Sequence, residues 1–330
     1  MGEKLAAGLD LGGTNVRGAL VTADGKIVKD MSRRTHAERG AGPVIEDMAE
    51  IVETLIAEAE VSRDDIIGLG VGAPGPLSHR DGVIYKSANL PGWQNVRMRR
   101  GLLERTGLPT VLDNDANTAG FAEFWVGAGK GVREMVCLTL GTGIGSGVIV
   151  GGEILRGHFE NAGELGHMVV RAEGRQCSCG QQGCLELYAS AANMAKYCME
   201  EIRAGAESSL SALLKAKGHF TARDVCEAAQ AGDEVGVKYW DEACRYLAIG
   251  CINAQHCYNP QLLVLAGGMT NMTGADVAPR GRRDRVLRHL VEMTAAGTVN
   301  RHLIHRHILR LENIEGHPPQ RAMFFGAAGI

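Results

Sequence analysis

The sequence has little proline and no marked excess of charge of either sign. Nine prolines in 330 residues, beside 45 glycines, exclude a collagen-like or low-complexity chain. The formal net charge of −3 leaves no surplus of positive charge for gripping a phosphate backbone, so nucleic acid is not expected as a partner. The glycine excess must therefore lie in particular turns.

The sequence also lacks a long, purely apolar run. Its N-terminus reaches Asp10 before any stretch that could serve as a signal peptide, so we expect a cytoplasmic protein. The longest uncharged window, Met135 to Gly152, has the length of a membrane span but contains six glycines. This pattern predicts two short strands around a turn, and no membrane partner is expected.

Length and composition indicate two lobes. A chain of 330 residues with 45% hydrophobic and 22% charged residues is typical of a globular protein that is too long for one small core. The mixture of strand and helix patterns predicts an α/β fold of two lobes separated by a cleft. We expect a small N-terminal lobe over residues 1–117, open to completion by residues 318–330, and a larger lobe over 118–317.

Two segments about 130 residues apart share one design. Strands are predicted at 5–11 and 16–21 around a Gly/Thr turn, and again at 135–140 and 146–150 around Gly141 to Gly145. The repetition indicates a duplicated architecture with one hairpin in each half. Other predicted elements are helices at 45–59, at 118–124 and through 189–256, and strands at 66–71, 110–112 and 262–266.

The two hairpin turns are candidate phosphate loops. No G-x-x-x-x-G-K-[ST] motif is present, and the glycine string from Gly70 to Gly75 runs into Pro76 without opening a helix, so Walker-type and dinucleotide-binding loops are not indicated. Glycine is also what a tight hairpin requires by itself. Two such turns, the first preceded by Asp10 in an apolar strand, favour phosphate binding, because a carboxylate there can hold Mg²⁺ through water.

The cluster Asp113-Asn114-Asp115 closes a predicted strand. Turn chemistry alone explains such a cluster, since Asn and Asp side chains form Asx-turns. A carboxylate in this position could equally accept the proton of an attacking hydroxyl. The residues by themselves favour the turn and leave the second interpretation open.

Three closely spaced cysteines and one histidine form the strongest local signal. His167 is followed by Cys177, Cys179 and Cys184, with glycines between the last two cysteines. Three thiolates and one imidazole make a closed zinc shell with no open position, so a bound zinc would be structural. Buried thiols without metal are the alternative.

Taken together and in this order, these segments resemble the ROK family of sugar kinases, within the actin/hexokinase (ribonuclease H-like) fold class. The resemblance runs from about residue 5 to 272 and is most specific in Glu-x-Gly-His and Cys-x-Cys-Gly-x-x-Gly-Cys. Within the family, the chain is most similar to the ATP-dependent bacterial glucokinases. Three segments carry this similarity: Asn89-Leu90-Pro91-Gly92-Trp93, Asp113-Asn114-Asp115-Ala116-Asn117 and Leu140-Gly141-Thr142-Gly143. The resemblance implies phosphorylation of glucose by ATP at the 6-hydroxyl.

The resemblance also implies a role for each matching residue. Asp115 would be the general base, with structural Zn²⁺ bound by His167, Cys177, Cys179 and Cys184. The sugar would be held by Asn89, Asn114, Asp115, Glu164, His167 and Glu186. The phosphates and Mg²⁺ of ATP would lie against Asp10, Gly12, Gly13, Thr14, Asn15, Gly141, Thr142 and Gly143, with Gly267 and Gly268 near the adenosine.

Some expectations stay open within this resemblance. An N-acetylmannosamine or N-acetylglucosamine kinase would share every motif, whereas a sugar-sensing transcriptional repressor would need a helix-turn-helix that nine residues before Asp10 cannot hold. We expect a homodimer or homotetramer. The sequence departs from the family in the segment 311–328, and the arginines and histidines between 280 and 307 are expected to form a solvated basic face.

Overall fold

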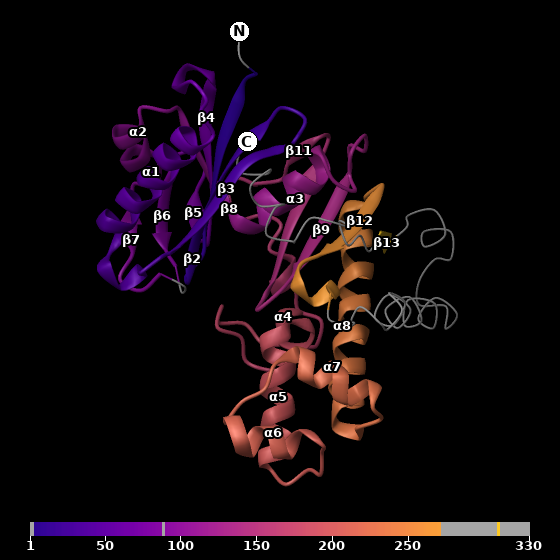
Figure 1. Cartoon of the computed structure of the whole chain (residues 1–330). Coiled ribbons are helices and arrows are strands. Elements are labelled where there is room, and N and C mark those ends of the chain that lie inside the picture. Colours follow the sequence, from indigo (N-terminus) through magenta and orange to yellow (C-terminus); the bar gives the residue numbers. More distant parts are fainter. Residues whose placement is uncertain (1–2, 88–89, 272–308, 311–330) are drawn as a thin grey trace. The chain divides into compact units, whose positions relative to one another are not determined.

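The computed structural model describes residues 3–87, 90–271 and 309–310 (Figure 1). Asn89, the basic face predicted between residues 280 and 307, and the predicted completion of the first lobe by 318–330 lie outside the described residues. The described chain is mixed α/β, as predicted.

A five-stranded sheet organises the N-terminal part in the order β3-β2-β1-β4-β8. Its strands are β1 (Leu5–Leu11), β2 (Asn15–Thr22), β3 (Ile27–Arg34), β4 (Ile66–Ala73) and β8 (Thr110–Asn114). β1 pairs antiparallel with β2, and β4 pairs parallel with both β1 and β8. All residues of β1 are buried, which explains their nearly continuous apolar character. The carboxyl ends of the parallel strands β1, β4 and β8 therefore lie at one edge of this sheet.

Two helices build the core of this part together with the sheet. α1 (Ala41–Glu58) and α2 (Met98–Thr106) bury apolar residues in one cluster with β1 and β4. The buried residues of α1 recur at three- and four-residue spacing, as in Met48, Val52 and Leu55, so one stripe of the helix enters the core. A small three-stranded sheet follows, with β5 (Leu77–Ser78), β6 (Val83–Lys86) and β7 (Gln94–Val96).

A second five-stranded sheet has the order β11-β10-β9-β12-β13. Its strands are β9 (Met135–Leu140), β10 (Ile144–Val150), β11 (Glu153–Ile154), β12 (Leu262–Ala266) and β13 (Leu309–Arg310). Position by position this order matches that of the first sheet, with β9 and β10 in the places of β1 and β2. Both hairpin turns have three residues, 12–14 and 141–143. The predicted duplication is therefore confirmed.

The predicted helical stretch after residue 189 is also confirmed. The short helix α4 (Glu186–Ala189) precedes it, and the stretch contains α5 (Ala191–Arg203), α6 (Leu210–Lys217), α7 (Ala222–Gln230) and α8 (Glu234–Tyr258). Thr221 and Asp224 form a capping box at the start of α7, and the Asp233 side chain accepts a hydrogen bond from the backbone of Gly236 at the start of α8. No helix among the described residues is both long and apolar enough to cross a bilayer.

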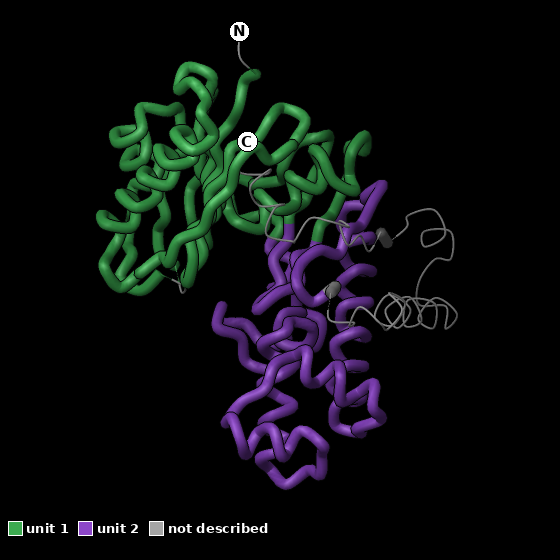
Figure 2. Tube along the Cα trace, in the orientation of Figure 1, with its two compact units in different colours: residues 1–137, 147–163, 314–330 green, residues 138–146, 164–313 purple. Residues whose placement is uncertain are grey.

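The chain divides into two compact units (Figure 2). Among the described residues, the first unit contains those up to 137 together with 147–163, and the second contains 138–146 and those from 164 onward. Strands β9 and β10 thus contribute residues to both units. The predicted boundary near residue 117 remains a prediction.

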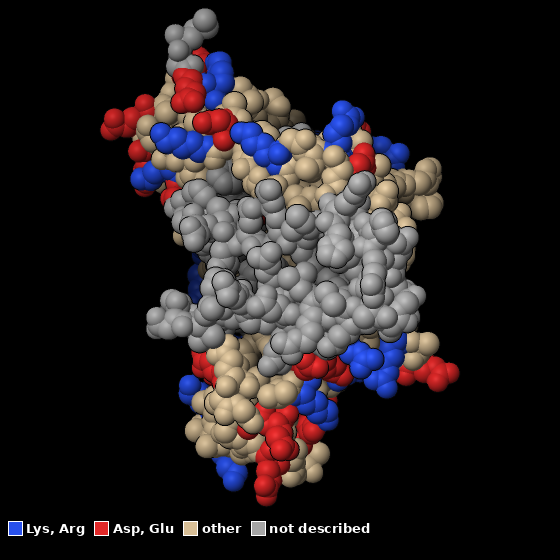
Figure 3. Space-filling model, turned by 90° about the vertical axis from the view of Figure 1, so that its right-hand side faces the viewer, with Lys and Arg blue, Asp and Glu red and all other residues tan. Residues whose placement is uncertain are grey.

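On the face shown in Figure 3, acidic and basic side chains of the described residues are interspersed.

The predicted start of the helix after β8 was wrong. The helix expected at 118–124 is α3 (Asp115–Trp125), which begins three residues earlier, directly at the end of β8. The reason is a cap: the side-chain oxygen of Asn114 accepts hydrogen bonds from the backbone of Ala116 and Asn117. Asp115 is consequently the first residue of a helix and not part of an irregular turn.

Candidate active site and metal centre

The first candidate phosphate loop lies in the first unit, between β1 and β2. The backbone N–H of Gly12 donates to the carbonyl of Asn15 at 3.0 Å, which closes the turn. Thr35 supports it from the end of β3, since its backbone N–H donates to the Thr14 carbonyl at 2.9 Å and its hydroxyl donates to the Gly12 carbonyl at 2.6 Å. Gly13 and Thr14 remain exposed at the tip. The loop is therefore fixed by hydrogen bonds from Thr35 while its tip stays accessible to a ligand.

Asp10 stands directly before this loop with a side chain that is almost fully buried. Its pKa is raised to about 7, chiefly by burial and also by the nearby charge of Asp115, while the charge of Arg17 opposes the shift. Arg17 lies opposite Asp10 in the β1–β2 ladder, and its Nη1 is 3.7 Å from the Asp10 carboxylate. A divalent cation would stabilise the charged form of Asp10, so this residue suits the predicted Mg²⁺ role.

Asn114 and Asp115 occupy the junction of β8 and α3 in the same unit. The Asn114 side chain caps the helix, with its Oδ1 accepting from Ala116 N at 2.9 Å and from Asn117 N at 3.2 Å. The hydroxyl of Thr118 donates to the Asp115 carbonyl at 2.7 Å. Both Asn114 and Asp115 are partly exposed, so a ligand can reach their side chains. Asp10 and Asp115 are close enough for their charges to interact.

The second candidate phosphate loop lies in the second unit. Gly141 N–H donates to the Gly143 carbonyl at 3.0 Å, and the Gly141 carbonyl accepts from Ala191 N at the start of α5. The Glu186 carboxylate accepts a hydrogen bond from Ile144 N at 2.9 Å. A side chain at Gly143 would place its Cβ only 2.3 Å from Glu186 Oε2, so glycine is what allows this carboxylate to approach the loop.

The predicted sugar ligands Glu164, His167 and Glu186 come together in this unit. Glu164 precedes the short 3-10 helix Leu165–His167, and His167 is its last residue. The Leu165 N–H donates to the Ser146 hydroxyl at 3.0 Å. Protein atoms around the otherwise accessible Glu164 carboxyl restrict its hydration and raise its pKa; Glu186 also raises it, and His167 opposes the shift. Two carboxylates can accept hydrogen bonds from several hydroxyl groups, and the imidazole can donate or accept one.

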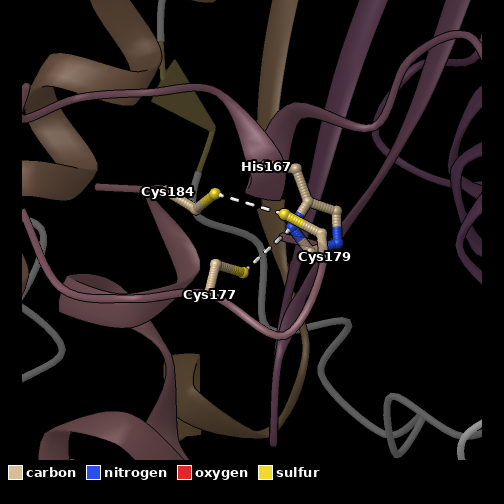
Figure 4. A group of neighbouring side chains, drawn as sticks. All are labelled: His167, Cys177, Cys179 and Cys184. Carbon is tan, nitrogen blue, oxygen red and sulfur yellow. Dashed lines mark hydrogen bonds between the residues drawn. The ribbon is translucent and has the colours of Figure 1, made fainter. Parts of the chain in front are cut away.

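The predicted metal ligands also lie together (Figure 4). The ligand atoms of His167, Cys177, Cys179 and Cys184 are all within 4.8 Å of one another. Cys179 Sγ lies 3.7 Å from Cys184 Sγ, and Cys177 Sγ lies 3.7 Å from His167 Nδ1. Zinc with thiolates about 2.3 Å away sets tetrahedral sulfur–sulfur distances of roughly 3.8 Å, so the cluster fits such an ion.

Zinc binding would also require the cysteines of the cluster to lose their protons. Burial, with the neighbouring thiols, raises the pKa of Cys184 to about 12, so a nearby positive charge is needed to make it a thiolate at neutral pH. His167 directs Nδ1 toward the cysteines and leaves Nε2 for another partner. The two ring nitrogens can therefore serve two different partners.

Gly267 and Gly268 follow β12. Gly267 has a φ of 102°, and a Cβ at this position would lie 2.5 Å from the carbonyl oxygen of Leu140, so only glycine fits. Gly268 is exposed and has open space around it. These two residues therefore form a bare backbone surface beside β9, which suits the predicted position near a flat adenine or ribose group.

Comparison with known proteins shows which family this chain is similar to. Residues 6–293 match the ROK family. A glucokinase from Halalkalibacterium halodurans is 36% identical over 271 residues, which cover 82% of each chain. The crystal structure of the ROK hexokinase from Thermus thermophilus has a TM-score of 0.79 at 32% identity and covers 98% of this chain and 96% of that one. A ROK family glucokinase from Streptomyces griseus, in complex with glucose and AMPPNP, has a TM-score of 0.77 at 26% identity and covers 98% of each.

Two sheets of the same strand order and two glycine-rich hairpin turns, together with the similarity to ROK kinases of known structure, identify a sugar kinase of the actin-like fold. The chain belongs to the ROK family. The resemblance stated from the motifs is therefore confirmed, and so is the enzymatic class.

Proposed function

We propose that this enzyme transfers the γ-phosphoryl group of ATP to the 6-hydroxyl of glucose, giving glucose 6-phosphate and ADP. The observation that carries the proposal is the position of Asp115 at the β8–α3 junction. Its carboxylate is partly exposed, its neighbour Asn114 is fixed as the helix cap, and Asp10 lies within electrostatic reach. Similarity to glucokinases, one of them bound to glucose and an ATP analogue, supports the choice of substrates.

In this proposal Asp115 accepts the proton of the 6-hydroxyl as the oxygen attacks the γ-phosphorus. The transition state needs little covalent help, so the enzyme contributes mainly by positioning and by stabilising charge. The backbone N–H groups of loops 12–15 and 141–143 would bind phosphate oxygens. Asp10 would hold Mg²⁺, which neutralises charge on the phosphates, while Gly267 and Gly268 would contact the nucleoside.

The remaining polar residues would recognise the sugar. Asn89, Asn114, Glu164, His167 and Glu186 offer carboxylate, amide and imidazole groups to the other hydroxyls, and His167 would use Nε2 because Nδ1 faces the cysteines. Zinc bound to His167, Cys177, Cys179 and Cys184 would be structural, since four protein ligands leave no open position. Sites that pair buried polar groups with substrate hydroxyls reject sugars that lack them.

The direct test is Asp115→Asn, with the exposed Asp64→Asn as a control for loss of one carboxylate. We expect turnover to fall at least a hundredfold in Asp115→Asn, because the amide keeps the shape but cannot take the proton. Glucose affinity, measured by calorimetry without nucleotide, should stay within a few-fold of wild type. A variant that keeps more than a tenth of wild-type kcat would exclude Asp115 as the base.

The same coupled ADP-release assay identifies the substrates. Glucose, mannose, fructose, N-acetylmannosamine and N-acetylglucosamine would be compared at equal concentration, with ATP or polyphosphate as donor. We expect the highest kcat/KM for glucose with ATP. A higher value for either N-acetylated sugar would overturn the substrate assignment while leaving the kinase class intact.

Light scattering would test the expected homodimer or homotetramer.

A further inference from the structure

Asp113, immediately before the cap residue Asn114, is buried with both carboxylate oxygens occupied. Its Oδ1 accepts from the backbone N–H of Asn114 at 2.7 Å and from Asn117 Nδ2 at 2.9 Å. Its Oδ2 accepts from Arg156 Nε at 2.9 Å and from Arg156 Nη2 at 2.6 Å. One oxygen is therefore bonded to the turn that carries Asp115, and the other to a guanidinium 43 residues further along the chain.

Arg156 is itself held from two sides. The segment 156–163 that it begins is closed by a hydrogen bond from Ala162 N to the Arg156 carbonyl at 3.0 Å. The Glu160 carboxylate accepts from the Ser78 hydroxyl at 2.6 Å and from Arg80 N at 2.9 Å, which fixes the segment against β5. All these residues belong to the first unit. Arg156 thus approaches Asp113 from an anchored loop.

Local structure alone does not account for this arrangement. Asn114 already caps α3 with its own side chain, so the helix does not need Asp113 for its start. Burying a carboxylate costs several kcal/mol unless ion pairing and hydrogen bonds offset the loss of hydration. Here the Asp113 side chain, 2% exposed, is paired with Arg156, and His79 Nδ1 lies 3.5 Å from the same Oδ2. What the pair determines is the orientation of the peptide that leads into Asp115.

We propose that Asp113 and Arg156 are positioning residues that fix the Asn114–Asp115 junction in the orientation that proton transfer requires. This inference rests on the proposed function, in which Asp115 is the base. A general base misplaced by about 1 Å can cost two orders of magnitude in rate, so the pair acts on kcat without touching substrate. The hydrogen bonds described for the pair go to the β8–α3 junction and not to the first phosphate loop, so we expect ATP binding to stay unchanged.

The kinetic test is a double-mutant cycle of Asp113→Asn, Arg156→Met and their combination. Each single change should lower kcat about tenfold to a hundredfold, with the KM for ATP within twofold. The double variant should be no slower than the slower single variant, because both changes break the same pair. Arg156→Lys, which keeps the charge but loses the two-pronged geometry, should recover part of the rate.

Arg63→Met is the matched control, because Arg63 also bonds a carboxylate, Glu53, in the first unit, but on the exposed surface. It should retain wild-type kcat. If Arg156→Met or Asp113→Asn keeps kcat within threefold of wild type, or if their losses in free energy add, the inference is wrong. Should Arg156→Met fold poorly, Arg156→Lys and Asp113→Asn still decide the question, since both retain volume.

A second measurement separates this inference from the proposed function. Hydrogen exchange of the peptide covering residues 110–120 needs no substrate, and it should be faster in Arg156→Met and Asp113→Asn than in wild type or Arg63→Met. Unchanged exchange would refute the positioning role even in an active kinase. If wild type phosphorylates no sugar while exchange rises as expected, the proposed function fails and the structural part of the inference stands.

Discussion

Asp10 is a buried carboxyl group whose pKa is raised to about 7 from an ordinary value of 3.8. The folded protein therefore binds this proton more tightly than the unfolded chain, so the group's contribution to stability is present at low pH and is lost as pH rises toward 7. The substitution Asp10→Asn removes this pH-dependent loss of stability, because an amide does not ionise. The stability gained by the substitution should grow by roughly 2–3 kcal/mol between pH 5 and pH 8.

Urea denaturation of wild type and Asp10→Asn at both pH values, without Mg²⁺, measures this difference. The ion pair with Arg17 forms only when Asp10 is ionised, and its effect is already contained in the pKa of about 7, so it needs no separate correction in the comparison. Asp24→Asn is the control, because the hydrogen bond from Thr22 lowers the pKa of Asp24 and both states are ionised from pH 5 to pH 8. A gain for Asp10→Asn that is equal at both pH values would contradict the burial argument.

Gly143 decides how closely Glu186 approaches the second loop. In Gly143→Ala the new methyl group would collide with the Glu186 carboxylate, which must then give up its hydrogen bond from Ile144 N. If Glu186 holds a sugar hydroxyl, glucose affinity measured by calorimetry should fall about tenfold or more. Gly42→Ala, in α1 with open space around its Cβ, should bind glucose as wild type does. Unchanged affinity in Gly143→Ala would remove Glu186 from the sugar site.

Residues whose partners are near in sequence could be predicted, and those with distant partners could not. The cluster of His167 with three cysteines was predicted because its spacing is itself the signal. Thr35 supports a loop 23 residues away and Arg156 pairs with Asp113 across 43, and neither has a local motif. Only the fold reveals such contacts.

At the scale of elements, the loop that carries the three cysteines of the cluster packs against α4, the helix that carries Glu186. Arg175 N–H donates to the Tyr188 hydroxyl at 2.8 Å, and the Arg175 guanidinium bonds to the Leu187 carbonyl and to Glu242. Cys177, Cys184, Leu187 and Tyr188 share one small core cluster. Loss of the metal should therefore disturb α4 and, through it, Glu186.

We expect about one zinc per chain in purified protein and none in Cys179→Ser. Glucose affinity should fall severalfold or more in this variant, because α4 is no longer fixed by the loop. Cys257→Ser, which removes another exposed cysteine outside the cluster, should keep both the metal and wild-type affinity. Metal analysis that finds no zinc in active wild-type protein would refute the assignment.

Strands that are continuous apolar runs were predicted well, and short or polar strands were not. β1, β9 and β12 begin and end at the predicted residues because all three are nearly continuous apolar runs. β3 was missed because its residues alternate between half-buried and exposed and include several charges. β5, β6 and β7 are too short to show a period, and their sheet depends on pairing within the fold.

At the scale of the whole molecule, the duplicated sheet does not make two equivalent units. The largest described core cluster, built on β1, β4, α1 and α2, lies entirely in the first unit, whereas the metal cluster and its small core lie in the second. Binding free energy of a structural metal adds to the folding free energy of the unit that provides its ligands. The two units should therefore differ in their dependence on zinc.

Hydrogen exchange before and after zinc removal by a chelator tests this difference. Peptides within 164–203, which hold the metal ligands, α4 and α5, should exchange faster once the metal is removed, because the loop and α4 lose their fixed connection. Peptides of the first unit within 5–73 should keep their protection, since they contain none of the proposed zinc ligands. Readdition of zinc should restore the original pattern. Equal loss of protection in both units would mean that they unfold as one cooperative structure, and the assignment of zinc stability to the second unit would be wrong.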